Sequence, residues 1–322
     1  MPTPLTNKIV INGKKKGMGY LKSFTSHKDF SAENPEIQKI LNKVNLGDVQ
    51  QETRMMMARS PKPNSSPQNL PPAVDFRKSM TPVRDQGELG SCTAFAASGI
   101  VEYFEQKANK KFTPLSTMFT YKTTRNLMKV TGDTGAFLRT VMGSIALFGS
   151  PPEEYWEYNG NGEGNNNRFD QEPPPFCYAF ASNFQSTRYL RIDQPNFVGQ
   201  YTLNLLKKFL QKQIPIMFGF TCFESLYQSN DNGGKIPYPS SNEHMIGGHA
   251  ITMCGYDDKL EITNTVDGSK TVGAIIIKNS WSEQWGDKGY GYIPYRYIVD
   301  KIADDCWTLV SQEWVDHLPF QE

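Results

Sequence analysis

The sequence of 322 residues contains no apolar run near the roughly 20 residues that a membrane-spanning helix needs. A membrane channel or anchor is therefore excluded. An excess of charge of one sign is also missing, because 34 Lys and Arg stand against 33 Asp and Glu. Such a chain has no charge excess to drive counterion release on a phosphate backbone, so we expect no binding of nucleic acid.

Cysteine and histidine are scarce, with five and four copies. The odd cysteine count, with no two at the spacing of a zinc knuckle, argues against a disulfide scaffold and a zinc ribbon. His244 and His249 have two glycines between them, which does not fit two metal ligands on one helix or strand face. We therefore expect neither a metal nor a cofactor.

The N-terminus does not resemble a secretory signal. Three lysines at residues 14–16 are not followed by the apolar stretch of roughly 7–15 residues that such signals contain. A cytoplasmic location is expected by default, and export by a route without such a signal stays open.

The charges divide the chain into a basic extension, residues 1–70, and an acidic body, residues 71–322. The extension has 11 Lys and Arg against 5 Asp and Glu, whereas the body has 23 against 28. Apolar periodicity predicts a helix at residues 31–46, with Ser31 as its cap. Five prolines at residues 60–72 predict an extended linker. The opposite charges favour docking of the extension on the body.

The body has a helical first half and a strand-rich second half, which predicts an α+β fold. A site between two such lobes is a common place for a cleft. Helices are expected at residues 91–108 and 136–148, and strands at residues 250–256, 273–279 and 289–294.

Three residues carry candidate chemistry. Cys92 lies in the first turn of the predicted buried helix, where backbone N–H groups and the helix dipole favour a thiolate. His249 begins a predicted strand and Asn279 ends another. Each residue alone has a structural alternative: a small buried thiol, an interior histidine and a turn former.

Taken together, the order Gln86, Cys92, His249 and Asn279-Ser-Trp resembles the papain-like cysteine peptidases. Cys92 and His249 are 157 positions apart, and His249 and Asn279 are 30 apart. The resemblance runs from residue 71 to about residue 307, and the segments DQGELGSCTA and GGHAITMCGYDD are closer to a bacterial-type branch. It implies a helical left lobe and an antiparallel, β-barrel-like right lobe with the active-site cleft between them.

Two positions depart from the common pattern of this family. Leu89 stands where many secreted members have a cysteine that forms a disulfide, so that bond cannot form. Thr93 replaces the tryptophan that usually follows the nucleophile. The local packing therefore differs, but no catalytic atom is lost.

The resemblance implies a thiol protease that hydrolyses peptide bonds. Cys92 would attack the peptide carbonyl and His249 would pair with its thiolate and then protonate the leaving amine. Asn279 would orient the histidine, Trp281 would cover that hydrogen bond, and Gln86 would donate to the oxyanion. An acyl transferase or peptide ligase on the same scaffold, and a non-catalytic binding protein, are the alternative functions.

Substrate contacts are implied for Gly135 and Ala136, which match the edge that pairs with a substrate backbone. Trp285 is a candidate for the leaving-group side, with a purely structural aromatic as its alternative. By position, residues 1–70 resemble an inhibitory propeptide, so we expect a zymogen whose partners are a peptide or protein substrate and its own extension.

Overall fold

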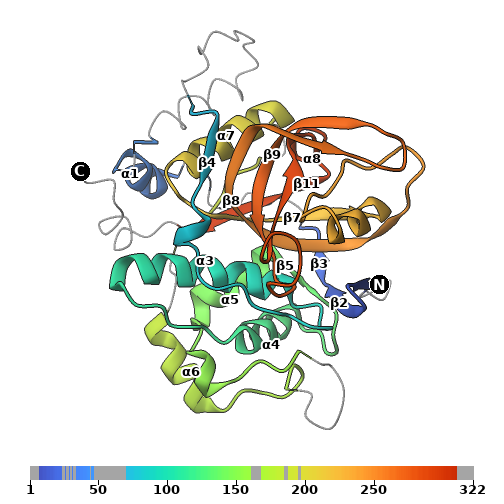
Figure 1. The fold of residues 1–322 in the computed structure, drawn as a ribbon. Helices are drawn as coiled ribbons and strands as arrows, with labels where there is room; N and C mark the ends of the chain where they lie inside the picture. Colours follow the sequence, from blue (N-terminus) through green and yellow to red (C-terminus); the bar gives the residue numbers. More distant parts are fainter. Residues whose placement is uncertain are drawn as a thin grey trace.

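Two lobes of different secondary structure make up the chain, seen in a computed structural model that describes residues 7–23, 26, 29, 31, 34–43, 45–46, 70–160, 168–184, 188–194 and 197–309. Helices α3 to α6 form one lobe and an antiparallel sheet forms the other (Figure 1). Strands β3 and β5 lie where the two lobes meet. The predicted α+β fold is confirmed.

The helical lobe is built around α3 (Cys92–Asn109), whose first 13 residues are all buried. Small side chains at Ala94, Ala96 and Ala97 let neighbouring elements approach closely. Helix α5 begins at Leu138, two residues later than predicted, because Ala136 and Phe137 form a strand instead. The other helices of this lobe are α4 (Thr117–Met128) and α6 (Pro175–Ala181).

The second lobe is a seven-stranded sheet with strand order β10-β9-β8-β7-β11-β6 and β4 paired to β8. In the described residues this path ends at β10 and β6, so the sheet is open and the implied barrel does not close. Helices α7 (Gly199–Gln211) and α8 (Tyr295–Val299) pack on it. The strands are β4 (Ala73–Asp75), β6 (Tyr189–Arg191), β7 (Ile216–Phe223), β8 (Met245–Thr263), β9 (Lys270–Lys278), β10 (Tyr290–Pro294) and β11 (Ala303–Leu309).

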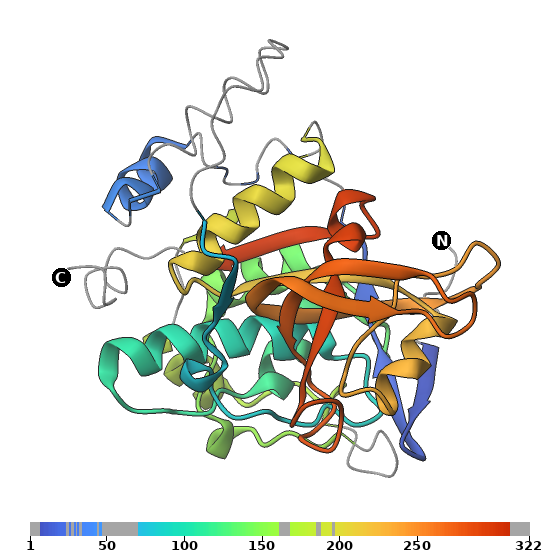
Figure 2. The same ribbon diagram turned by 45° about the horizontal axis from the view of Figure 1, so that its top comes forward.

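The extension contributes a hairpin of β1 (Asn7–Ile11) and β2 (Lys14–Met18). Asn12 and Gly13 both have positive φ, 50° and 73°, which is the backbone of the two-residue turn that suits a twisted hairpin. Strand β3 (Tyr20–Leu21) then pairs in parallel with β5 (Ala136–Phe137) at the junction of the lobes. Figure 2 shows the hairpin at the side of the sheet.

The predicted helix of the extension is present as α1 (Pro35–Lys43) and is shorter than expected. Asn34, not Ser31, is its cap: the Asn34 side-chain oxygen accepts hydrogen bonds from the backbone N–H groups of Glu36 and Ile37, at 2.9 and 3.4 Å. Residue 44 of the predicted range lies outside the described residues, as does most of the proline-rich segment.

Apolar side chains of the extension belong to the main hydrophobic core. Ile9, Ile11 and Met18 are each 2% exposed and pack in the same cluster as the sheet and α3. Removing residues 7–23 would therefore uncover apolar surface as well as break hydrogen bonds.

Within the described ranges, none of the helices is both long and apolar enough to cross a bilayer.

Candidate active site

Cys92 is the first residue of α3 and is completely buried. Backbone N–H groups of Gly19, Ala250 and Thr93 lie close enough to its sulfur to lower the pKa of the thiol. These three donors come from the extension, from β8 and from α3 itself. The thiol therefore lies between the two lobes, beneath the extension.

His249 lies on β8 and Asn279 directly follows β9, two neighbouring strands. The Asn279 side-chain oxygen is 2.8 Å from His249 Nε2 and also accepts the backbone N–H of Ser280 at 2.8 Å. The Ser280 N–H can bond only to the oxygen of the Asn279 amide, so it is the oxygen that also faces the His249 ring. An oxygen accepts, so His249 Nε2 must carry the proton and donate it. The remaining nitrogen, Nδ1, then keeps its lone pair.

The His249 ring is held between aromatic side chains. Trp281 stacks on it with ring centroids 4.4 Å apart and an interplanar angle of 22°. Phe220 meets it edge-on. Trp281 therefore lies against the face of the His249 ring, and its role in covering the bond between His249 and Asn279 stays a prediction.

Trp285 is fully buried and lies edge-on against Trp281, 5.6 Å between ring centroids. Its indole N–H donates to Ser229 Oγ at 3.3 Å. In this state the indole supports Trp281 and presents no surface to the cleft. The role of Trp285 in substrate binding stays a prediction.

Gln86 is fully buried and is bonded at every part of its side-chain amide. Its Nε2 donates to the carbonyl oxygens of Gly17 and Leu89, both at 2.9 Å, and its Oε1 accepts from Ser280 Oγ at 2.6 Å. The backbone N–H of Gln86 donates to Ser280 O at 2.9 Å. The predicted oxyanion donor is thus fixed to the segment that carries Asn279 and is occupied by a carbonyl of the extension.

At Gly17 and Gly19 the extension contacts the site through main-chain atoms. Gly17 N–H donates to Gly87 O at 3.1 Å, and Gly19 O accepts Ala136 N–H at 2.8 Å. A Cβ on Gly19 would overlap the Gly90 carbonyl, and one on Gly135, where φ is 74°, would overlap Gly19 O. Gly135 and Ala136, the predicted substrate edge, therefore bind the extension in this state.

Basic residues of the extension pair with acidic residues of the body around the cleft. Lys16 is 3% exposed and lies 2.6 Å from Asp85. Farther along the chain an acid of the extension, Asp29, meets Arg139 of the body at 2.5 Å. Two more lysine pairs of this kind are Lys8 with Glu88 and Lys22 with Asp304.

Burial determines the protonation of the candidate pair in this state. Burial raises the pKa of the Cys92 thiol to about 11, against the opposing effect of the three backbone N–H groups. Burial lowers the pKa of His249 to about 4, and its bond to Asn279 acts in the opposite direction. Both groups are therefore neutral at pH 7, and His249 Nδ1 has no hydrogen-bond partner among the described residues. The expected thiolate–imidazolium pair is not formed here because the covered cleft withholds water from both groups.

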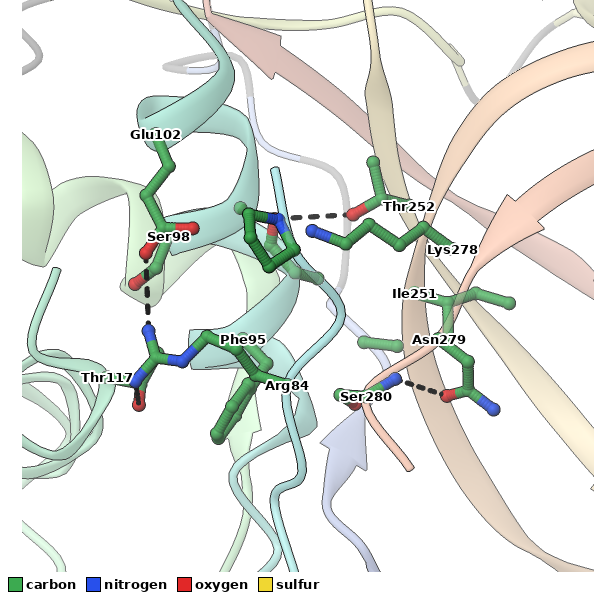
Figure 3. A pocket seen from close by; sticks show the side chains of 14 residues that line it. Arg84, Phe95, Ser98, Glu102, Thr117, Ile251, Thr252, Lys278, Asn279 and Ser280 are labelled. Carbon is green, nitrogen blue, oxygen red and sulfur yellow. Dashed lines mark hydrogen bonds and ion pairs between the residues drawn. The ribbon is translucent and has the colours of Figure 1, made fainter. Parts of the chain in front are cut away.

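Charged side chains join the two lobes around a small pocket of about 20 Å³ that Asn279 helps to line (Figure 3). Lys278 Nζ donates to Thr81 at 2.9 Å, and burial lowers the pKa of this lysine to about 8. Across the cavity on α3, Glu102 pairs with Arg84 at 3.2 Å. Burial raises the pKa of the Glu102 carboxyl.

Sequence reasoning missed this inter-lobe set and the course of the extension. Nothing in the sequence around Lys278 indicates that it bonds to Thr81, about 200 positions earlier in the chain. The extension did carry one signal, the alternating glycines in residues 17–20, GMGY. Alternate glycines allow a backbone to lie directly against another backbone. In the searched part of the chain, no cluster of three or more His, Cys, Asp or Glu could hold a metal.

A buried thiol at a helix start, a histidine hydrogen-bonded to an asparagine and a buried side-chain amide are the residue types of a cysteine peptidase site. Residues 70–306 match the model of the papain family cysteine proteases. The chain belongs to this family and is a papain-like cysteine peptidase.

Similar proteins include viral, animal and bacterial members. An uncharacterised peptidase C1-like protein of Acanthamoeba polyphaga mimivirus is 33% identical over 76% of each chain. Cathepsin K of Mus musculus is 27% identical over 70% of this chain and 60% of its own. The crystal structure of xylellain, a cysteine protease from Xylella fastidiosa, has a TM-score of 0.70 and 28% identity, and covers 92% of this chain and 97% of its own.

Proposed function

We propose that the protein is a peptidase made in a closed, latent form, with Cys92 as nucleophile and residues 7–23 as the segment that blocks the cleft. The observation that carries this proposal is the bond from Gln86 Nε2 to the Gly17 carbonyl. A donor suited to a peptide oxyanion already holds a peptide oxygen of the extension. The same cleft therefore fits an extended peptide backbone.

In the open enzyme, His249 Nδ1 takes the Cys92 proton, and the sulfur attacks the substrate carbonyl carbon. Gln86 Nε2 donates to the oxyanion that forms. The imidazolium then gives its proton to the leaving amine, which leaves a thioester on Cys92. Water adds to the thioester with His249 as base, and the free acid and the thiol are restored. Asn279 keeps the ring in place throughout.

The extension supplies the latency in three ways. Gly17 O occupies the oxyanion donor, and the backbone of Gly19 covers the sulfur of Cys92. The bond from Ala136 to Gly19 also takes the edge that a substrate needs. The paired charges at Lys8, Lys16 and Lys22 support the docking inferred from the opposite net charges of the two segments.

Replacing the oxyanion donor by Gln86→Ala should lower kcat/KM of the open enzyme by about 10²–10³-fold, because one donor to the transition state is lost. The same change removes a bond to Gly17, so the cleft should also open more readily. Steady-state hydrolysis and thiol accessibility separate the two effects. Gln200→Ala is the control, since Gln200 is bonded to Asn204 one turn along α7, and it should change neither quantity.

Acidification should open the closed form. His249 has an ordinary pKa of 6.5 and a pKa of about 4 in the closed state, so between these values only the open state binds the proton. The full advantage of the closed state is therefore present above pH 6.5. As the pH falls from 6.5 toward 4, the ratio of closed to open molecules decreases by up to about tenfold per pH unit. Lys8 also lowers the pKa of Glu88, which acts in the same direction.

The experiment measures peptide hydrolysis and Cys92 labelling of the full chain, and of a chain that starts at residue 71, from pH 7.5 to 4.5 and at two salt concentrations. At pH 7.5 the full chain should be much slower than the shorter chain, and the ratio of the two rates should approach one as the pH falls and the cleft opens. Equal rates for both chains under every condition would contradict the proposed latency. No hydrolysis by either chain would contradict the proposed peptidase activity.

A further inference from the structure

One acid of the extension, Asp29, lies between an arginine of each lobe. Its Oδ2 is 2.5 Å from Arg139 Nη2 on α5 and 4.0 Å from Arg191 Nη1 on β6. The same oxygen accepts the backbone N–H of Ser26 at 3.0 Å. The Asp29 side chain is 5% exposed, so these donors replace most of the water that a carboxylate otherwise binds. The two lobes therefore build a carboxylate site together.

The charges at this site are the reverse of the net charges of the two segments. The extension is basic as a whole and the body is acidic, yet here the extension supplies the acids and the body supplies the arginines. Arg188, three residues before Arg191, pairs with Glu36 of α1 at 3.3 Å and repeats this polarity. Attraction between the net charges does not explain such a contact, which requires a specific site on the body.

Arg191 is held in place by the body itself. Its guanidinium lies 3.0 Å from Asp193, 3.1 Å from Asp305 and 5.5 Å from the centroid of the Trp307 ring. The side chain is 3% exposed. Its Nη1, the nitrogen nearest to Asp29, makes no hydrogen bond of good geometry within the described residues. A buried donor of this kind costs free energy, and a ligand oxygen would lower that cost. Arg191 is thus fixed in position to receive an anion.

The site lies close to the edge that holds a peptide backbone in the cleft. Strand β3 runs parallel to β5 with Leu21 beside Phe137, and Arg139 follows two residues later on α5. The N–H of Ala136, the residue before Phe137, donates to Gly19 O at 2.8 Å. A substrate held at the same edge therefore has one of its two ends directed toward the arginine pair.

Release of the extension removes two acids from this surface, Asp29 and Glu36. The ion pairs of Arg191 with Asp193 and Asp305 belong to the body and remain. Three arginines, at residues 139, 188 and 191, are then left with these two aspartates. The net positive charge beside the cleft favours an incoming carboxylate.

We propose that in the open enzyme Arg139 and Arg191 bind an acidic side chain of a peptide substrate, at the place that Asp29 occupies in the closed chain. The ligand is an aspartate or glutamate that lies several residues away from the scissile bond. The proposal rests on the proposed peptidase function, because the substrate must be held in the cleft. The arginines do not touch the reacting atoms, so they change KM and not kcat.

Substrates with a charged arm test this site. Each has the same scissile segment and an arm of ten Gly and Ser residues, attached before or after it, that ends in aspartate, asparagine or lysine. This length matches the ten positions from Gly19 to Asp29. The enzyme is the full chain with Gly19→Ala and Asp29→Asn, changes expected to open the cleft and to remove the competing acid. For one of the two arms, aspartate should lower KM at least about fivefold relative to asparagine at equal kcat, and lysine should raise it.

Arg139→Gln should bring the ratio of the asparagine and aspartate KM values near one, and Arg139→Lys should keep part of it because the charge stays. Arg296→Gln is the control and should leave the ratio unchanged, since Arg296 pairs with Asp300 at the surface. Equal KM values for aspartate and asparagine with both arms, or an aspartate preference that Arg139→Gln does not reduce, would overturn the proposal.

The same peptides are also bound without turnover to this chain with Cys92→Ala added, and their Kd values are measured by fluorescence anisotropy. Tighter binding of the aspartate peptide, weakened by Arg139→Gln, supports the site even if the enzyme hydrolyses nothing. This measurement separates failure of the site from failure of the peptidase function. Equal Kd values for the aspartate and asparagine peptides, or no binding of any peptide, would contradict the site.

A last measurement uses the otherwise natural full chain and requires neither hydrolysis nor a change at the arginines. Asp29→Glu should keep the labelling of Cys92 slow at pH 7.5, because the carboxylate is retained. Asp29→Asn should speed the labelling at least about fivefold, because an amide carries no charge for the two guanidinium groups. Unchanged labelling of Asp29→Asn, in a chain that melts at the temperature of the natural one, would count against recognition of a carboxylate at this place.

Discussion

Replacing Cys92 by alanine should abolish peptide hydrolysis, with a loss in kcat on the order of 10⁶, the scale seen when a peptidase loses its nucleophile. No other group in the site can form the thioester, so His249 and Gln86 are left to bind the substrate without chemistry. The rates are measured at acidic pH, where the cleft should be open. The substituted chain should still bind peptide.

Cys177→Ala is the matched control for this change. Cys177 is as buried as Cys92, but it lies on α6 in a small separate cluster with Phe119 and Ala181. Its sulfur is 3.6 Å from Tyr155 O and far from the cleft chemistry in the fold. Full activity of Cys92→Ala, or loss of activity in Cys177→Ala with an unchanged melting temperature, would contradict the assignment.

Replacing Gly19 by alanine should convert the latent chain into an active one at neutral pH. The added methyl group would overlap the carbonyl of Gly90, and main-chain atoms cannot turn aside as a side chain can. The extension must then shift, which breaks the bond from Ala136 to Gly19 O and the N–H contact at Cys92. Hydrolysis and thiol labelling at pH 7.5 should both rise at least tenfold over those of the natural chain.

Val10→Ala tests whether any change in the extension has this effect. Val10 lies on β1 with its side chain 53% exposed, so its truncation removes little packing. That chain should stay latent. If Gly19→Ala folds with an unchanged melting temperature and is as latent as the natural chain, the extension is not what closes the cleft.

The sequence sufficed for those parts of the site that depend on local pattern and on motif order. The small residues after Cys92 predicted a buried helix, and α3 occupies nearly that range. The strands around residues 250–256 and 273–279 were also expected, because a strand-like composition bounded by Gly and Asp is a local property. Motif order then pointed to His249 and Asn279, and the structure brings them to 2.8 Å.

What the sequence could not predict is a set of contacts between distant segments. The bonds of Gly17 and Gly19 are made by main-chain atoms, which every residue has, so only the missing side chains hinted at them. The start of α5 was misplaced for the same reason, since Ala136 pairs with the extension instead of entering the helix. A tertiary strand pairing overrode a local helical pattern.

The net charges predicted that the extension and the body attract each other, but they did not predict which residues form ion pairs. The opposite net charges of the extension and the body predicted attraction, and Lys16 and Lys22 do meet acids of the body. The protonation of Cys92 and His249 was not predictable, because it depends on water being excluded by a segment whose course was unknown. Burial outweighs the helix-terminus effect at Cys92.

The most direct measurement of the central claim is labelling of the full chain with a peptidyl epoxide that reacts with thiols, followed by mass mapping of the adduct. All five cysteines are free and buried, so each is a possible target once exposed. The natural chain should be labelled slowly at pH 7.5 and Gly19→Ala rapidly, in both cases at Cys92 alone. Adducts on any other cysteine, or equally rapid labelling of the natural chain at pH 7.5, would contradict a nucleophile at Cys92 held closed by the extension.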